Sequence, residues 1–355
     1  MKVIYDKNYK VFFGADVLNE LAQTIITKGY SHVFVLVDEN TEKYCLPILK
    51  PYLEKFTVIK IESGEKNKNL ASAELVWHSL QQNLANRNTV LLNLGGGVLG
   101  DLGGFCAATY KRGIDFMNIP TTLLGMVDAS IGGKLGIDIN HYKNLIGLFK
   151  HPEQVFIYPN FISTLPNIEK TNGLAEIFKH SLVADKKLFE KIITSNQIDF
   201  EHMEKLIEKS AKIKIEIVNK DPNEKGLRKV LNFGHTIGHA IETFSLTNDA
   251  VPLKHGEAVA IGIICETYLS YKLFNIDDKD LGKIVQFITV NFNKYMPKWD
   301  VNELFKIMQN DKKNNNSNIN FTLLKKIGKA VIDCNCSNEL IMESLEFYKN
   351  QAYLN

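Results

Sequence analysis

The chain has 355 residues, of which 45% are hydrophobic and 23% charged, and its formal net charge at pH 7 is +2. This length accommodates two domains with separate cores, and the composition is that of an ordinary globular protein. The balanced charge and dispersed basic residues argue against a nucleic-acid-binding protein, and no apolar run approaches the roughly 18 residues that span a membrane. We therefore expect neither nucleic acid nor membrane as a partner.

Short β-branched runs alternate with helical stretches in the first half of the chain. The expected strands are residues 2–5, 10–13, 32–37, 56–61, 89–94, 115–119 and 154–157. The expected helices are residues 16–28, 42–53, 69–84 and 98–109. This alternation predicts an α/β domain over residues 1–160, with a mainly parallel, Rossmann-like sheet covered by helices.

The spacing of apolar residues changes in the second half of the chain. Apolar residues recur at three- and four-residue spacing in segments 171–183, 199–219, 228–245, 254–273 and 278–290. This spacing predicts a mostly helical domain over residues 161–355, with Pro159 and Pro166 near the boundary. The Asn/Lys-rich stretch 310–320 is typical of a surface loop, and short strands are expected at 319–324 and 330–332.

The start of the chain and the cysteines lead to two further expectations. Its start, Met1-Lys2-Val3-Ile4, lacks the apolar segment of a signal peptide, so a cytoplasmic location is expected. The five cysteines are an odd number without framework spacing, which favours buried or inert thiols.

A glycine cluster follows the expected strand 89–94. Gly95, Gly97 and Gly100 fit the G-x-G-x-x-G pattern, in which glycines let the backbone approach a phosphate at a helix N-terminus. The acid-terminated strand ending at Asp38 precedes these glycines, whereas the usual dinucleotide fingerprint places it after them. A tight strand-to-helix turn without a ligand is the alternative.

The segment from Ile119 to Lys134 is dense in hydroxyls and glycines and contains one acid, Asp128. Its small residues permit close backbone contact with a ligand, and Lys134 offers an ammonium to an anion. Lys143-Asn144 follows nine residues later. The alternative is a solvated loop.

Three histidines fall within 21 residues, at positions 235, 239 and 255. His235 and His239 are four apart, so both rings would project from one face of a helix. Imidazole is the commonest protein ligand for zinc-like ions, and three ligands with an open position form a catalytic site. An HxxxH pair alone is a weak signal, and two polar helix positions are the alternative.

Other polar side chains are expected on helix faces. Glu176 and Lys179 are three apart on an expected helix, where an exposed ion pair is the simpler interpretation. Arg228, Asn232 and the two nearby histidines would lie near one face of the expected helix 228–245. Such groups are costly to bury without partners, so the alternative is an exposed polar stripe.

Taken together, these motifs resemble the 3-dehydroquinate synthase family of sugar-phosphate cyclases. The resemblance rests on GGGVLGDLGGF (95–105), YKRG (110–113), PTTLLGMVDASIGGK (120–134), KNLIG (143–147), GLAEIFKH (173–180), LNFGHTIGHA (231–240) and KHGEAVAIG (254–262). The motifs cover roughly residues 30–270 in the family's order. The resemblance implies an NAD-binding N-terminal domain and a helical C-terminal domain that binds one divalent metal ion, usually Zn or Co.

The resemblance also assigns residues. It implies metal ligation by Glu176, His235 and His255. It implies NAD contacts by Asp38, Asn40, Glu65, Lys68, Gly96, Gly97, Val98, Asp101, Thr121, Thr122, Asp128, Lys143, Thr164 and Glu169. It implies catalytic or substrate contacts by Arg112, Asp128, Lys134, Asn144, Lys179, Lys214, Arg228, Asn232 and His239, with Lys312 as a weaker match beside the low-complexity stretch. Lys134 and Arg228 are expected to act mainly on the substrate rather than on stability.

The implied reaction converts 3-deoxy-D-arabino-heptulosonate 7-phosphate to 3-dehydroquinate and phosphate in the shikimate pathway. Oxidation at C5, phosphate elimination, re-reduction, ring opening and aldol closure regenerate NAD, and a homodimer is implied. The sequence departs from the family at Gly125-Met126, Asp138, Tyr142 and Tyr158, which affects the expected loop shape and affinity. A metal-dependent polyol dehydrogenase, another sugar-phosphate cyclase and an inactive scaffold on this fold are the alternatives.

Overall fold

The computed structural model describes residues 1–139, 142–194, 198–309 and 319–354, which form two compact units. The first unit comprises Met1–Lys170 with Phe200–Asn219, and the second comprises Thr171–Asp199 with Lys220–Asn355. The two units interleave along the sequence. The predicted division into domains at residue 160 stays a prediction, and each unit is described by itself.

A seven-stranded sheet forms the centre of the first unit, in the order β1-β2-β9-β6-β5-β3-β4. Its strands are β1 (Lys2–Tyr5), β2 (Lys10–Phe13), β3 (His32–Val37), β4 (Thr57–Lys60), β5 (Thr89–Gly95), β6 (Asp115–Pro120) and β9 (Gln154–Ile157). All neighbours run parallel except β1 and β2. Because β5 is central and covered on both faces, all of its residues are buried. The predicted mainly parallel sheet is confirmed.

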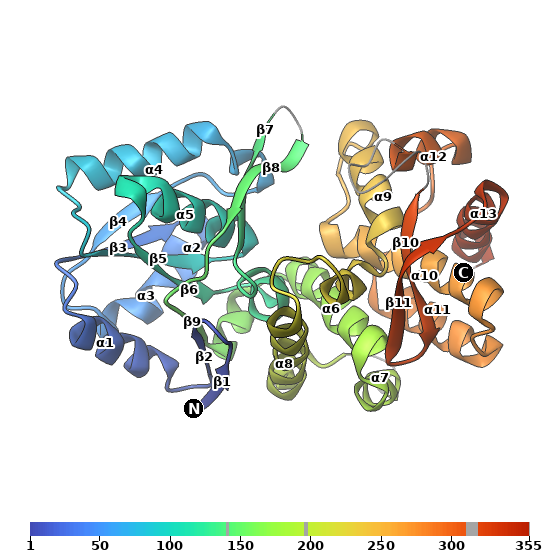
Figure 1. Ribbon diagram of the computed structural model, residues 1–355, viewed down its shortest axis with the longest axis horizontal. Coiled ribbons are helices and arrows are strands. Elements are labelled where there is room, and N and C mark those ends of the chain that lie inside the picture. Colours follow the sequence, from blue (N-terminus) through green and yellow to red (C-terminus); the bar gives the residue numbers. More distant parts are fainter. Residues whose placement is uncertain (140–141, 195–197, 310–318, 355) are drawn as a thin grey trace. The chain divides into compact units, whose positions relative to one another are not determined.

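Helices cover both faces of this sheet (Figure 1). They are α1 (Val17–Lys28), α2 (Glu39–Tyr44), α3 (Leu46–Leu49), α4 (Leu70–Gln82) and α5 (Gly97–Thr109), and α8 (Glu204–Lys220) joins the unit through its residues up to Asn219. On the α4 and α5 side, Phe34 and Leu36 of β3 belong to one buried apolar cluster with Val76 and Leu102. The expected single helix 42–53 is wrong. Pro47 and Pro51 lack the amide that a continuous helix needs, so the segment breaks into α2, α3 and a 3-10 turn at Lys50–Tyr52.

The segment after β6 folds in a way that the sequence did not reveal. A π-helical turn at Gly125–Ala129 leads into an antiparallel hairpin of β7 (Lys134–Ile139) and β8 (Tyr142–Phe149). Leu135 of β7 is buried on α5, where a Cβ added to Gly104 would lie 2.5 Å from the Leu135 side chain. The solvated-loop alternative for 119–134 is therefore wrong, because most of this segment is buried.

The second unit is mostly helical, as predicted. It contains α6 (Asn167–Ala184, from Thr171 onward), α7 (Lys186–Ile193), α9 (His235–Asn248), α10 (His255–Phe274), α11 (Asp278–Asn291), α12 (Val301–Gln309) and α13 (Asn338–Leu354), with a hairpin of β10 (Asn320–Lys326) and β11 (Lys329–Asn335). The sequence analysis did not identify α7, α12 or α13. Helix α10 is the central element, because 15 consecutive residues from Gly256 to Ser270 are buried. No helix in the described ranges has the length and apolarity to cross a membrane.

The expected continuous helix 228–245 is wrong. Residues Leu227–Asn232 form a 3-10 turn, and Gly234 has a φ of 78°, so α9 begins only at His235. Glycine is required here because a Cβ would lie 2.6 Å from the Ile263 side chain of α10. A Cβ at Gly262 would lie 2.0 Å from the Gly234 carbonyl oxygen, so α9 and α10 pack backbone against backbone.

Candidate active site

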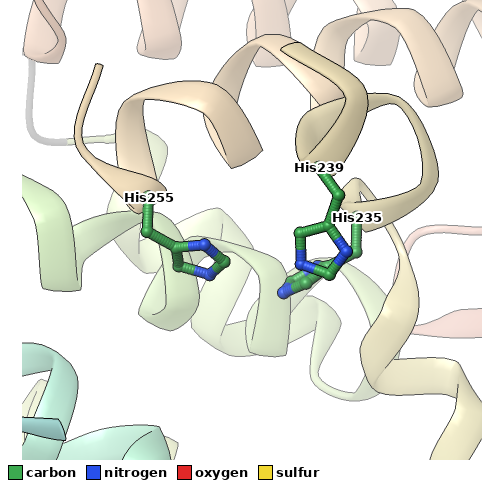
Figure 2. A group of neighbouring side chains, drawn as sticks. All are labelled: His235, His239 and His255. Carbon is green, nitrogen blue, oxygen red and sulfur yellow. The ribbon is translucent and has the colours of Figure 1, made fainter. Parts of the chain in front are cut away.

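Three histidines of the second unit face one another. His235 and His239 lie one turn apart on α9, and His255 is the first residue of α10 (Figure 2). The ring centroids of His235 and His255 are 5.4 Å apart, and those of His235 and His239 are 5.1 Å apart. One nitrogen from each ring lies within 4.8 Å of the others. The close packing of α9 on α10 therefore gathers imidazoles that are 20 residues apart in the sequence.

A buried carboxylate completes this cluster. Glu176 of α6 is 1% exposed, and its Oε1 lies 3.5 Å from His235 Nε2 and 3.7 Å from His255 Nε2. Its other oxygen contacts the ammonium of Lys179, which is 2% exposed. The alternative of an exposed Glu176–Lys179 ion pair is wrong, because both side chains are buried.

The far nitrogen of each of two rings is also engaged. His235 Nδ1 is 3.1 Å from the Phe233 carbonyl oxygen, and His255 Nδ1 is 3.2 Å from Glu242 Oε2. Both partners are acceptors, so Nδ1 carries the proton when the ring is neutral. The lone pair of each Nε2 then faces Glu176. This is the arrangement by which metal-ligating histidines are oriented.

The donor set fits a divalent ion. Two imidazole nitrogens and one carboxylate oxygen converge, which suits zinc or cobalt and leaves a position for substrate. His239 lies beside them, and the family resemblance assigns it to the substrate instead. The choice of Glu176 rather than His239 as the third ligand stays a prediction.

The charges around the histidines shift their pKa values in opposite directions. Burial lowers the pKa of His235 well below its usual value, and the nearby Lys179 ammonium lowers it further. Burial also disfavours protonation of His255, but Glu176 and Glu242 outweigh it and raise the pKa of His255 to about 9. Without metal, His255 is therefore protonated at neutral pH and His235 is neutral.

Two more predicted substrate residues lie in the turn before α9. Arg228 is 1% exposed, and its Nη1 donates to the Pro222 carbonyl oxygen at 2.7 Å. Asn232 Nδ2 donates to Glu224 Oε1 at 3.2 Å. Arg228 is one of the largest fully buried side chains, so its removal should also lower stability. The expectation that Arg228 acts mainly on the substrate is revised to include this effect on stability. The break at Gly234 removes both residues from the helical face of His235.

Several predicted nucleotide residues of the first unit follow the carboxyl ends of neighbouring strands. Strands β3 and β5 are parallel neighbours, so Asp38 after β3 and the glycines after β5 follow the carboxyl ends of adjacent strands. Gly96 is the N-cap of α5, and a Cβ there would lie 2.8 Å from the Thr122 side chain. The Asp38 carboxylate accepts from Thr41 N at 2.7 Å and so caps α2.

A charged network adjoins the glycine turn. Lys68 is 3% exposed, and its Nζ lies 2.6 Å from Asp101 Oδ2 of α5 and 3.8 Å from Glu65 Oε1. Lys143 Nζ of β8 lies 3.9 Å from the same Glu65 oxygen. Four residues predicted to contact NAD, from three separate segments, therefore lie together in the first unit.

A second ion pair of this unit joins two predicted residues. Lys214 Nζ of α8 lies 2.7 Å from Asp128 Oδ1 in the π-helical turn. Lys134 begins β7 and is exposed. The backbone amide of Asn144 donates to Asp138 Oδ1 at 2.7 Å, so the Asp at this family departure shapes the hairpin. Arg112, with a φ of 68°, lies in the short turn after α5.

The remaining predicted positions lie on several elements of the first unit, and Thr121 N donates to the Gly95 carbonyl oxygen beside the glycine turn at 3.0 Å. Gly97 and Val98 are the first residues of α5, and Thr121 directly follows β6. Asn40 lies on α2. Thr164 ends the 3-10 turn after β9, and Glu169 lies near the start of α6. Gly125 and Met126 are buried in the π-helical turn, and Tyr158 precedes the Pro159–Thr164 turn. Lys312 and the side chain of Tyr142 lie outside the described residues.

Sequence reasoning missed the residues that orient the site. Glu242 of α9 is 5% exposed and faces His255 Nδ1. Asn172 Oδ1 accepts from Gly256 N at 2.6 Å and caps α10 directly after His255. A Cβ at Gly256 would lie 2.0 Å from the Asn172 carbonyl oxygen, which explains the glycine after His255. The available signal for Glu242 in the sequence was an acid three residues after His239.

Comparison with known proteins identifies the family. Residues 58–172 match the family described as 3-dehydroquinate synthase N-terminal, and residues 173–314 match 3-dehydroquinate synthase C-terminal. The chain belongs to the 3-dehydroquinate synthase family. A 3-dehydroquinate synthase of Parabacteroides distasonis is 40% identical over 349 residues, which cover 96% of this chain and 98% of that protein. One from Campylobacter concisus is 41% identical over 298 residues, 83% of this chain and 85% of that protein.

Solved structures share the fold. A 2-deoxy-scyllo-inosose synthase complexed with carbaglucose-6-phosphate, NAD+ and Co2+ superposes with a TM-score of 0.86 at 23% identity, covering 96% of this chain and 98% of that one. A 2-epi-5-epi-valiolone synthase from Streptomyces hygroscopicus, with NAD+ and Zn2+ bound, also has a TM-score of 0.86, at 24% identity and 99% coverage of both chains. An iron-containing alcohol dehydrogenase is more distant, with a TM-score of 0.64 at 14% identity over 99% of both chains. The predicted fold class and family are confirmed.

The raised pKa of His255 predicts pH-dependent metal binding. A metal ligand must be deprotonated, so an ion that binds between about pH 7 and 9 displaces one proton from His255. Apparent affinity should rise about tenfold per pH unit in this range and level off above about pH 9. Calorimetric titration with Zn²⁺ in buffers of different ionisation enthalpy would count the proton. Release of no proton at pH 7.5 would contradict the prediction, and Glu242→Gln should reduce the release by lowering the pKa of His255.

Proposed function

We propose that this protein is a 3-dehydroquinate synthase, an NAD- and divalent-metal-dependent phosphorus–oxygen lyase. It would convert 3-deoxy-D-arabino-heptulosonate 7-phosphate to 3-dehydroquinate and phosphate for aromatic amino acid biosynthesis. The family match over residues 58–314, together with the convergence of His235 and His255 on buried Glu176, carries this proposal. An inactive scaffold would have no reason to keep a buried charged cluster that is costly without a ligand.

Different residues would bind the metal ion and NAD. Glu176, His235 and His255 would hold the metal ion, and the turn at Gly96 beside Asp38 would hold NAD. When bound, the metal ion supplies Lewis acidity and the nicotinamide accepts and returns a hydride.

The predicted cations would bind the substrate's anionic groups. On the second unit, Lys179 is held by Glu176 and Arg228 by the Pro222 carbonyl, so both are oriented before substrate arrives. On the first unit, Lys134 is an exposed residue at the start of β7 and would offer its ammonium to an anion. His239, half-buried beside His235, would carry a proton on a ring nitrogen. The homodimer and the cytoplasmic location stay predictions.

Phosphate release from the heptulosonate phosphate tests this function. Release should require both NAD and metal, stop with a chelator, and proceed without steady accumulation of NADH. Stoichiometric NADH would instead indicate a polyol dehydrogenase. Turnover of glucose 6-phosphate, which lacks the carboxylate, would indicate another sugar-phosphate cyclase. No release from either substrate with both cofactors supplied would indicate a non-catalytic protein.

A further inference from the structure

The start of helix α9 is held by a carboxylate from a different helix. Glu266 lies within α10 and has 0% exposure. One of its oxygens accepts from Gly234 N at 2.6 Å, and the other accepts from Ile237 N at 3.0 Å. These two amides bracket His235, the first residue of α9.

This contact replaces a cap that α9 cannot supply for itself. The first amides of a helix have no intrahelical acceptor, and the N-cap of α9 is Gly234, which has no side chain to cap them. A buried amide without an acceptor is unfavourable, and a negative charge is favourable at a helix N-terminus. Glu266 meets both requirements with one side chain.

The position of the His235 ring depends on this anchor. Glycine at 234 gives the backbone before His235 more conformational freedom than any other residue would. Two contacts fix the backbone on either side, from Glu266 to residues 234 and 237, and a third joins Thr236 Oγ1 to the Asn320 carbonyl oxygen at 3.1 Å. The ring itself bonds only its own segment among the hydrogen bonds described, through Nδ1 and the Phe233 carbonyl oxygen. A shift of the backbone would therefore move Nε2 away from Glu176.

We infer that Glu266 is a positioning residue for His235 and sets where its Nε2 points within the metal site. The inference rests on the proposed function, because it takes His235 to be a metal ligand. Glu242 positions His255 by direct contact with Nδ1 of its ring. Glu266 acts indirectly, through the backbone amides of Gly234 and Ile237 on either side of His235.

Metal binding to purified protein, measured without substrate, tests the inference. Zn²⁺ affinity is determined by competition with a chromophoric chelator, and the visible absorption of Co²⁺-loaded protein reports the ligand geometry. In Glu266→Gln the amide group can accept from one backbone N–H but presents its own donors to the other. Zn²⁺ affinity should fall about 10- to 100-fold, as for other residues that orient metal ligands, and the Co²⁺ spectrum should change.

Two further variants calibrate this result. Glu343→Gln changes a carboxylate of α13 whose described bonds are to Tyr268 and Lys272 of α10, so it should keep parental affinity and spectrum. Glu242→Gln should also weaken Zn²⁺ binding under conditions in which His255 is deprotonated, because Glu242 orients that ring directly. Loss of affinity in the Glu343 variant equal to that in the Glu266 variant would show a general effect of loosening α10 and would overturn the inference.

The outcomes separate the inference from the proposed function. A parent protein that binds neither ion overturns the proposed function and the inference with it. If the parent protein binds metal and Glu266→Gln has the same Zn²⁺ affinity and Co²⁺ spectrum, the inference is overturned but the proposed function is not. If Glu266→Gln does not fold, Glu266→Asp replaces it, because the shorter acid keeps the charge but cannot reach both amides. Parental metal binding in that variant, or failure of both variants to fold, would also overturn the inference.

Discussion

His235→Ala is expected to abolish metal binding while the metal-free protein still folds. His235 Nε2 lies 3.5 Å from Glu176 Oε1, and its removal leaves a carboxylate and one imidazole of the predicted ligand set. Loss of a ligand should cost more than the 10- to 100-fold typical of residues that only orient ligands, so activity should fall by more than about a hundredfold. Elemental analysis of the purified variant and phosphate release measure the two effects.

A histidine outside the cluster provides the control. His78 on α4 is 62% exposed and pairs with Glu74 on the same helix, so His78→Ala should keep a full equivalent of metal and full activity. The unfolding temperature of metal-free His235→Ala should stay near that of the metal-free parent. A His235→Ala protein that keeps a full equivalent of metal would show that His235 is not a ligand and would favour a set containing His239.

Lys134→Ala is expected to lose activity with little change in stability. Lys134 is exposed at the start of β7, so its side chain contributes little to the core, and surface substitutions change stability by about 0.5 kcal/mol or less. An ammonium that pairs with a desolvated anionic substrate is worth about 2–5 kcal/mol. The corresponding loss in kcat/KM lies between about thirtyfold and several thousandfold.

The opposite strand of the same hairpin supplies a matched control. Lys134 pairs in register with Phe149, and the adjacent Lys150 is also an exposed lysine. Lys150→Ala should keep parental turnover, while both variants should keep parental unfolding temperature and NAD affinity. Near-parental turnover in Lys134→Ala would make Lys134 an ordinary surface residue and would weaken the case for a doubly anionic substrate.

Local patterns in the sequence determined much of the fold. The buried run Thr89–Gly95 and the alternation of strands and helices predicted the parallel sheet, because a central parallel strand is apolar along its whole length. The helical spacing over 254–273 predicted α10 to within a residue at each end. The motifs around the glycines and histidines identified the family, since each combines several residue types in a fixed order.

Sequence patterns gave the wrong secondary structure where tertiary packing overrode a helical preference, and they missed a hairpin where the strand signal was weak. Helical periodicity continued through residues 228–245, but the close packing of Gly234 on α10 required a positive φ and broke the helix. The small and polar residues after Ile119 gave no strand signal, yet burial of Leu135 on α5 stabilises the hairpin β7–β8. Both are tertiary effects, because the partner surface lies far away in the sequence.

The same distinction between local pattern and tertiary contact applies to the candidate site. The sequence by itself supplied the residue types that bind metal, phosphate and nucleotide, because chemistry restricts these to a few side chains at recognisable spacing. It could not show that Glu176 and Lys179 are buried, that β3 lies beside β5, or that Glu242 and Glu266 brace the histidines. Burial and long-range contact depend on which segments the folded chain brings together, and only the tertiary structure decided them.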